Sequence, residues 1–140
     1  FPGCALTADM ITGFPGETEA DQAAAVAFLE QVGFAAVHVF PYSRRPGTKA
    51  DAMPEQLSHA VKSARAHEAQ RVADACKQRY LVQQVGQTLP VLFETEHDGS
   101  WVGHSDNYCL VRAAGDDLRG LVKNVKISAV SGQMLVGDLV

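Results

Sequence analysis

The feature that most constrains the fold of this chain is an abrupt change of residue pattern at Gly86. Between Pro54 and Gly86 there is no further Pro or Gly, and Ala, Gln, Lys and Arg are abundant. This composition predicts one long helix that begins at Pro54 and ends near Gln83. After Gly86, short apolar stretches alternate with turn-forming residues. The chain is therefore predicted to have two parts, residues 1–84 and residues 85–140.

The first part opens with a predicted strand–helix–strand unit. Residues 5–12 and 36–40 are short apolar runs, typical of buried strands. Thr18 and Asp21 resemble the two members of a capping box, and Gly33 is a typical residue at a helix end, so a helix is predicted between them. Parallel sheets are buried on both faces, and such a unit requires neighbouring strands. We therefore expect it to belong to a larger α/β domain.

The long helix is predicted to bury one apolar stripe. Its members are Leu57, Val61, Ala64, Glu68, Val72 and Ala75. The same helix carries basic residues, among them Arg65, Arg71, Lys77 and Arg79. We interpret them as a solvated face, with an RNA contact as the alternative.

The second part is predicted to be all-β. The expected strands cover residues 88–96, 101–104, 108–113, 121–130 and 134–140. Five short antiparallel strands in such a length predict a small barrel related in shape to the OB fold. The loop of residues 103–108 and the basic side chains suit RNA, but packing alone could explain them equally well.

The charge balance argues against nonspecific nucleic-acid binding by this chain alone. The chain carries 12 basic and 16 acidic residues, for a net charge of −4. Within residues 85–140, four basic residues face seven acidic ones, for a net charge of −3. Nucleic-acid-binding domains are usually basic, although a local basic face can still contact phosphates.

The cysteines and the chain start add further expectations. Cys4, Cys76 and Cys109 are too far apart for a metal or redox motif, and we expect them to be small buried residues. No apolar run is long enough to span a membrane, and no signal peptide is visible. Because the sequence starts at Phe1 without Met, we expect a further part of the protein to precede it.

Two loops at the predicted strand ends are candidates for a site. Residues 13–17 follow the first strand, and residues 41–48 follow the second. In β/α barrels the site lies at the carboxyl ends of the strands. Tyr42, Ser43 and Arg45 would offer a ring, a hydroxyl and a guanidinium there. Alternatively, the glycines only turn the chain and the polar residues only face water.

Three segments resemble one enzyme family. Residues 9–18 (DMITGFPGET), residues 39–48 (VFPYSRRPGT) and the β-rich tail resemble the radical S-adenosylmethionine methylthiotransferases, whose tail is a TRAM domain. Residues 38–43 and 103–108 are most similar to the branch that acts on N6-threonylcarbamoyladenosine in tRNA. The implied fold is α/β: the C-terminal strands and helices of a partial TIM-type barrel, followed by a small antiparallel β-barrel, the OB-like TRAM domain.

The resemblance implies a transferase that adds a methylthio group to C2 of the modified adenosine beside the anticodon. Its cofactors would be S-adenosylmethionine and two 4Fe–4S clusters. The family's C-x-x-x-C-x-x-C motif is absent, so both clusters would be ligated outside this chain. This chain alone is therefore expected to be inactive, with no catalytic residue and no metal ligand of its own.

The resemblance also implies site residues and partners. The S-adenosylmethionine site would include Ile11, Gly13, Phe14, Pro15, Gly16, Glu17, Phe40, Tyr42 and Ser43. The RNA-binding residues would be Arg45, His104, Asn107, Tyr108, Arg112, Lys123 and Lys126. The expected partner is the tRNA anticodon stem-loop, bound by a cytoplasmic monomer.

Four alternatives stay open, one of which, an unrelated β/α fragment, would require two motifs to match by accident. One is an RNA-binding module that acts in trans, and another is a methylthiotransferase of the isopentenyladenosine or ribosomal-protein branch. The third is a different radical S-adenosylmethionine enzyme with an unrelated β tail. A tail that fails to close into a barrel would favour the third.

Overall fold

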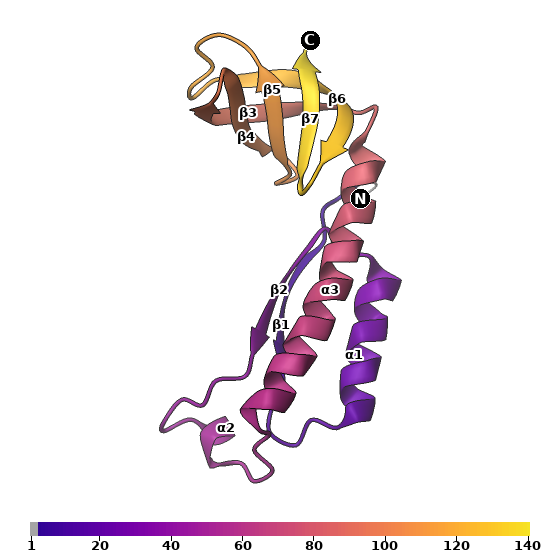
Figure 1. Ribbon diagram of the computed structural model, residues 1–140, viewed down its shortest axis with the longest axis vertical. Helices are drawn as coiled ribbons and strands as arrows, with labels where there is room; N and C mark the ends of the chain where they lie inside the picture. The colour runs from indigo at the N-terminus through magenta and orange to yellow at the C-terminus, as the bar shows by residue number, and fades with distance from the viewer. Residues whose placement is uncertain (1–2) are drawn as a thin grey trace. The chain divides into compact units, whose positions relative to one another are not determined.

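The computed structural model describes residues 3–140 and divides into two compact units (Figure 1). One unit is Leu6–Lys77, and the other is Gln78–Val140 together with the residues up to Ala5. The division falls inside the long helix α3 (His59–Gln84), so its last turns belong with the β-rich unit. The predicted domain boundary after residue 84 stays a prediction.

The strand–helix–strand unit is confirmed. Strands β1 (Thr7–Thr12) and β2 (Ala36–Pro41) pair in parallel, from Thr7 opposite Ala36 to Thr12 opposite Pro41. Helix α1 (Glu19–Val32) connects them. Its capping box and its left-handed C-terminal glycine are present as predicted.

Only one face of this small sheet is covered by helices. Leu29, Val37, Ala69 and Ala73 form the buried cluster between the sheet, α1 and α3. The opposite face leaves Ile11 and Phe40 more than half exposed, at 56% and 51%. This pattern agrees with a sheet fragment that needs neighbours, while the TIM-type barrel itself remains a prediction.

Helix α3 begins later than its predicted start at Pro54. The hydroxyl of Ser58 accepts the N–H of Val61, as an N-cap residue does. Pro54 instead lies in a loop, and the next residue, Glu55, has a positive φ of 60° that no helix accommodates. A separate single turn, α2 (Lys49–Ala52), follows the predicted loop of residues 41–48 and is capped by Thr48.

The predicted buried stripe of α3 was also wrong by one helical position. The buried members are Lys62, Arg65, Ala66, Ala69, Ala73, Cys76, Tyr80, Leu81 and Gln84. Ala64, Glu68 and Ala75 are exposed. Val72 of the predicted stripe is half-buried and packs against the core, whose fully buried members on this helix are Ala69 and Ala73.

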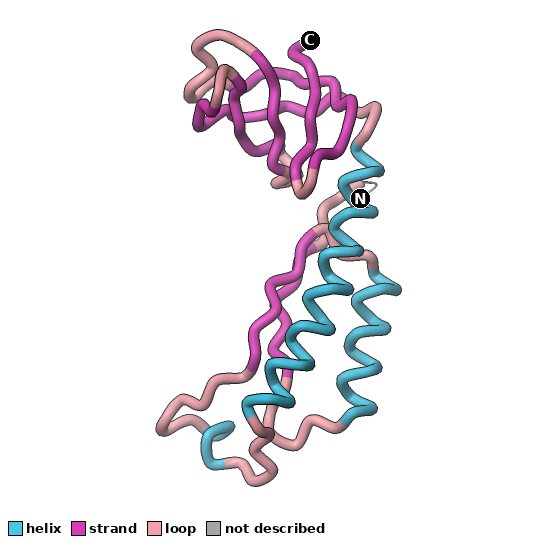
Figure 2. Tube along the Cα trace, in the orientation of Figure 1, coloured by secondary structure: helices cyan, strands magenta, loops and turns pink. Residues whose placement is uncertain are grey.

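The C-terminal strands close into a barrel (Figure 2). The strands are β3 (Thr88–His97), β4 (Ser100–Ser105), β5 (Leu110–Ala114), β6 (Val122–Ser131) and β7 (Met134–Leu139). Their order around the barrel is β3-β4-β5-β7-β6, with β6 returning to β3. All five predicted strands are therefore confirmed, and so is a small β domain.

The prediction of a purely antiparallel barrel was wrong. Strands β5 and β7 pair in parallel, with Val111 opposite Leu135. The reason is parity: directions cannot alternate all the way round a closed ring of five strands, so one neighbouring pair must be parallel. The interior is filled by side chains from several strands, including Phe93, Trp101, Val125 and Ile127.

Candidate functional site

The loop of residues 13–17 at the end of β1 is folded around the carboxylate of Glu17. Both oxygens of this carboxylate lie 2.9 Å from the backbone N–H of Gly13, and one also accepts from Phe14 at 3.3 Å. Gly13 has a φ of 70°, and a Cβ there would lie 2.6 Å from Cγ of Lys62. The loop therefore requires glycine at this position, both for its backbone conformation and for space.

Arg65 of α3 fixes the same carboxylate from the helix side. Its Nη1 donates to Oε1 of Glu17 at 2.6 Å and to the backbone oxygen at 2.9 Å. Its Nη2 donates to Glu19 at 2.7 Å. The hydrogen bond to Glu19 and then that to Glu17 raise the pKa of Arg65, against an opposing effect of burial. Glu17, predicted to bind cofactor, thus has its carboxylate engaged in shaping the loop.

Sequence reasoning missed Arg65, which it interpreted as part of a solvated face. The Arg65 side chain is only 7% exposed. Its partners lie 46 and 48 residues earlier in the chain, so no local spacing could reveal the pairing. Arg71 and Arg79 are exposed on the same helix, as predicted.

The structure brings the two predicted strand-end loops together. The rings of Phe14 and Tyr42 meet edge to face, with centroids 5.1 Å apart. The N–H of Tyr42 donates to the backbone oxygen of Thr12 at 2.8 Å. The ammonium of Lys62 lies 4.8 Å from the centre of the Tyr42 ring. Thr12 Oγ1 and the Tyr42 hydroxyl are buried without a hydrogen-bond partner in the described structure.

The remaining predicted cofactor residues have different surroundings. Ile11 and Phe40 are opposite each other in register and form an exposed apolar strip on the open face of the sheet. The N–H of Gly16 donates to the backbone oxygen of Glu55 at 3.2 Å. Pro15 is buried, and Ser43 is exposed.

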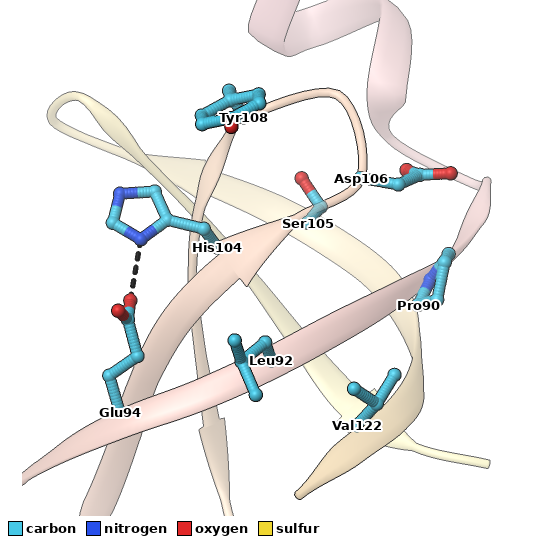
Figure 3. Close-up of a pocket in the computed structure, with 8 residues that line it drawn as sticks. All are labelled: Pro90, Leu92, Glu94, His104, Ser105, Asp106, Tyr108 and Val122. Atoms are coloured by element: carbon cyan, nitrogen blue, oxygen red, sulfur yellow. Dashed lines mark hydrogen bonds and ion pairs between the residues drawn. The ribbon is translucent and has the colours of Figure 1, made fainter. Parts of the chain in front are cut away.

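A groove of about 440 Å³ lies on the outer surface of the barrel (Figure 3). Pro90, Leu92 and Val122 supply its apolar surface, and the last two are 43% and 63% exposed. Glu94, His104, Asp106 and Tyr108 supply the polar and aromatic lining. Two of the predicted RNA-binding residues, His104 and Tyr108, therefore lie at one site.

The loop that carries Tyr108 is held by Asn107. The amide nitrogen of Asn107 donates to the Tyr80 hydroxyl and to Oε1 of Gln84, both at 3.1 Å. Its amide oxygen accepts from Ser105 Oγ at 2.6 Å. Asn107 was predicted to bind RNA, but all of these contacts are internal, so the geometry gives it a positioning role beside Tyr108.

Tyr80 is the helix partner of this loop and another residue that sequence reasoning missed. Its hydroxyl donates to the backbone oxygen of Gly3 at 3.2 Å while accepting from Asn107. Burial raises the pKa of Tyr80, and the hydrogen bond from Asn107 partly offsets that rise.

His104 and Glu94 form the polar side of the groove. Nδ1 of His104 lies 2.6 Å from Oε2 of Glu94. An ionised carboxylate can only accept, so we assign the hydrogen of this bond to Nδ1. The dashed line in Figure 3 marks this pair, with Leu92 between it and Pro90.

The predicted basic residues do not line the groove. Arg112, Lys123 and Lys126 are exposed on β5 and β6, and Nζ of Lys126 donates to the backbone oxygen of Gly86. Arg112 lies two residues beyond Leu110, which pairs with His104. Arg45 is exposed in the other compact unit.

Other expectations concern metals, thiols and membranes. Within residues 3–140, no group of three or more His, Cys, Asp or Glu side chains could hold a metal ion. Cys76 and Cys109 are buried as expected, but Cys4 is exposed, contrary to the prediction. Among the described helices, none is long and apolar enough to cross a membrane.

Comparison with known proteins gives consistent relatives. The threonylcarbamoyladenosine tRNA methylthiotransferase MtaB of Bacillus subtilis is 38% identical over 90% of this chain. The tRNA-2-methylthio-N(6)-dimethylallyladenosine synthases of Maricaulis maris and Campylobacter jejuni are 40% and 36% identical over 99% of it. No protein-family model matches the chain.

The chain thus has two compact units, and in sequence a βαβ unit comes before a small closed β barrel. Over nearly its whole length, this chain is homologous to the MtaB- and MiaB-type tRNA methylthiotransferases. It spans about 30% of the length of these relatives, 29% of the Bacillus protein and 31% of the Maricaulis protein.

Proposed function

We propose that this chain is part of a tRNA methylthiotransferase, in which the βαβ unit contributes to the S-adenosylmethionine site and the barrel binds tRNA. The observation that carries the proposal is 36–40% identity over 90–99% of the chain to enzymes named for this reaction. The full-length enzyme would be a cytoplasmic monomer that recognises the anticodon stem-loop. Its clusters would be ligated outside this chain, which alone would be inactive.

The proposed substrate is N6-threonylcarbamoyladenosine, as in the Bacillus relative. Residues 38–43 and 103–108 support this branch by their similarity to it. The dimethylallyladenosine synthases match at similar identity, so their substrate is the second candidate. Mass spectrometry of tRNA nucleosides, from a host that lacks both activities and expresses the full-length enzyme, distinguishes the two products.

The strand-end loops support an S-adenosylmethionine site by their shape. Ile11 and Phe40 offer an exposed apolar strip that suits an adenine ring. The Tyr42 hydroxyl is buried without a hydrogen-bond partner in the described structure, and its ring packs against Phe14. When bound, S-adenosylmethionine supplies the methyl group and the radical chemistry. The protein residues named here would only bind and orient it.

The barrel supports RNA binding by its exposed aromatic ring and its surface cations. We propose that it is a TRAM domain in which Tyr108 and His104 contact bases, while Arg112, Lys123 and Lys126 contact phosphates. Arg45 of the other unit would contact a further phosphate. Asn107 would hold Tyr108 in place. An RNA-binding module that acts in trans would use the same surface.

The test of RNA binding uses the whole 140-residue chain and a fluorescein-labelled anticodon stem-loop, with anisotropy measured over a range of salt concentrations. Replacing Arg112 and Lys123 with Gln should weaken binding and reduce the magnitude of the slope of log K against log salt by about 2, if each contacts one phosphate. Replacing Arg71 and Arg79 is the control. Absence of binding, or an unchanged slope, contradicts the proposed interface.

A further inference from the structure

We propose that the groove on the barrel is a guanine-selective subsite for one unstacked base of the bound RNA. This inference rests on the proposed RNA-binding function and adds a specificity that the relatives' names do not state. It is carried by the combination of an exposed aromatic ring, an apolar floor and carboxylates in one groove.

The groove provides a stacking platform. The Tyr108 side chain is 86% exposed, and its φ of 59° is unfavourable for a bulky residue. Strain of this kind persists only where surrounding contacts enforce it, here those of Asn107. The ring and the exposed Leu92 and Val122 line the same groove. An unstacked base is the RNA group that fits such a lining, since bases stack on aromatic side chains.

The hydrogen-bonding groups of the groove favour guanine over the other bases. Glu94 and Asp106 are carboxylates, which when ionised only accept hydrogen bonds. Guanine presents two adjacent donors, N1–H and the N2 amino group, on its Watson–Crick edge. Adenine and cytosine present one amino group there, and uracil presents one N–H. His104 bonds to Oε2 of Glu94, which fixes the half-exposed carboxylate and leaves Oε1 to accept from a base.

The charge of the groove determines which part of the RNA enters it. No Lys or Arg is among its described lining residues, and Glu94 and Asp106 repel phosphate. The base must therefore enter while the sugar–phosphate chain passes outside. Arg112 lies along β5 beyond Leu110, the partner of His104, where it could contact that chain.

The experiment compares four short uridine-rich RNAs that differ only in their central base, each bound to the whole chain and measured by anisotropy. We expect the RNA with central guanine to bind about tenfold more tightly than the others, which is the size of discrimination that one good base contact provides. Glu94→Gln should abolish this preference, because the new amide group replaces an acceptor with a donor. Tyr108→Ala should weaken all four RNAs about tenfold.

The matched control is Glu96→Gln, which makes the same charge change on the same strand outside the groove. It should leave the guanine preference intact. Equal binding of the four RNAs, no binding of any, or a preference that survives Glu94→Gln overturns the guanine subsite. Binding of the anticodon stem-loop in the same assay separates these outcomes from failure of RNA binding itself, which would contradict the proposed function.

Discussion

The loop of residues 13–17 and the groove on the barrel use their polar groups in opposite ways. In the loop, Glu17 and Arg65 are mostly buried, at 15% and 7% side-chain exposure, and bond to each other and to the backbone. In the groove, Glu94 and His104 are about half exposed, at 50% and 48%. The Glu17 carboxylate is thus engaged within the fold, whereas the groove exposes its polar side chains to solvent.

This difference shows that the residues of a strong motif need not be the residues that touch a ligand. Glu17 belongs to the segment that most clearly resembles the family, yet its carboxylate holds the loop in shape. The groove includes Leu92, Glu94 and Val122, which no motif singled out. The comparison predicts that loop variants change stability, while groove variants change binding.

The largest expected effect comes from Arg65→Ala. Removing the guanidinium leaves the partly buried carboxylate of Glu17 without its cationic partner, which should lower the free energy of unfolding by about 3 kcal/mol. Urea unfolding followed by far-UV circular dichroism measures this change in the helical unit. Arg71→Ala, on an exposed position of the same helix, should change stability by less than about 0.5 kcal/mol. Equal effects of the two variants would show that Arg65 does not anchor the loop.

A second test, Gly13→Ala, separates the cost of a positive φ from the cost of steric crowding. At Gly13 the new methyl group meets Lys62 in addition to the positive φ, so we expect a loss of about 2–3 kcal/mol. Gly33 has a similar φ of 68°, but a Cβ added there would meet nothing within 4 Å, so Gly33→Ala should cost only about 1 kcal/mol. If Gly13→Ala costs no more than Gly33→Ala, crowding by Lys62 contributes nothing.

Elements with local signals could be predicted from the sequence. The capping box at Thr18 and the five strands of the barrel depend on short spacings and turn residues, and the structure confirms them. The start of α3 could not be predicted, because Pro54 is as favourable at a helix start as Ser58 is at an N-cap.

The candidate sites were predictable only in part. Tyr108 and His104 belong to a visible motif, but their groove also depends on β3 and β6 pairing so that Leu92 lies opposite Val122. Arg65 and Tyr80 act through partners far away in sequence, at separations of 48 and 27 residues. No local sequence pattern encodes such contacts, because tertiary packing brings the two partners together.

Tyr80→Phe tests the support beneath the groove. The variant removes one hydroxyl that bonds to Asn107 and Gly3, so stability should fall by about 1 kcal/mol, and placement of Tyr108 should loosen. Fluorescence of Trp101, the single tryptophan, reports unfolding of the barrel. RNA affinity should fall less than in Tyr108→Ala.

Tyr80 should also make the stability of the barrel unit fall at alkaline pH. The pKa of Tyr80 in the folded protein is raised above the ordinary value of 10.0. The stabilisation of the folded state that accompanies this shift is fully present below pH 10 and is lost as the pH rises through the folded pKa. Tyr80→Phe should flatten that alkaline decline in the Trp101 signal. An equally steep decline in the variant would assign the effect to another group.

A further small effect is expected at the helix cap that follows the loop of residues 13–17. Thr18→Ala removes the hydroxyl that accepts from the N–H of Asp21 and should cost about 1 kcal/mol. The side-chain hydrogen bond with Thr18 is the main reason that the pKa of Asp21 is lowered below 3.8. The stabilisation of the folded state by ionised Asp21 is therefore present above pH 3.8 and is lost as the pH falls through the folded pKa of Asp21.

When the pH is lowered through the folded pKa of Asp21, the Thr18→Ala variant should lose less stability than the parent chain. Circular dichroism during acid titration measures this difference. Thr48→Ala is a matched control, because Thr48 caps only the single exposed turn of α2. Its effect should be smaller, since a one-turn helix contributes little to the folded state. RNA binding at the groove should be the same in both variants, because neither side chain lies in the barrel unit. A change in RNA affinity from Thr18→Ala would instead mean that the loop and the groove are coupled.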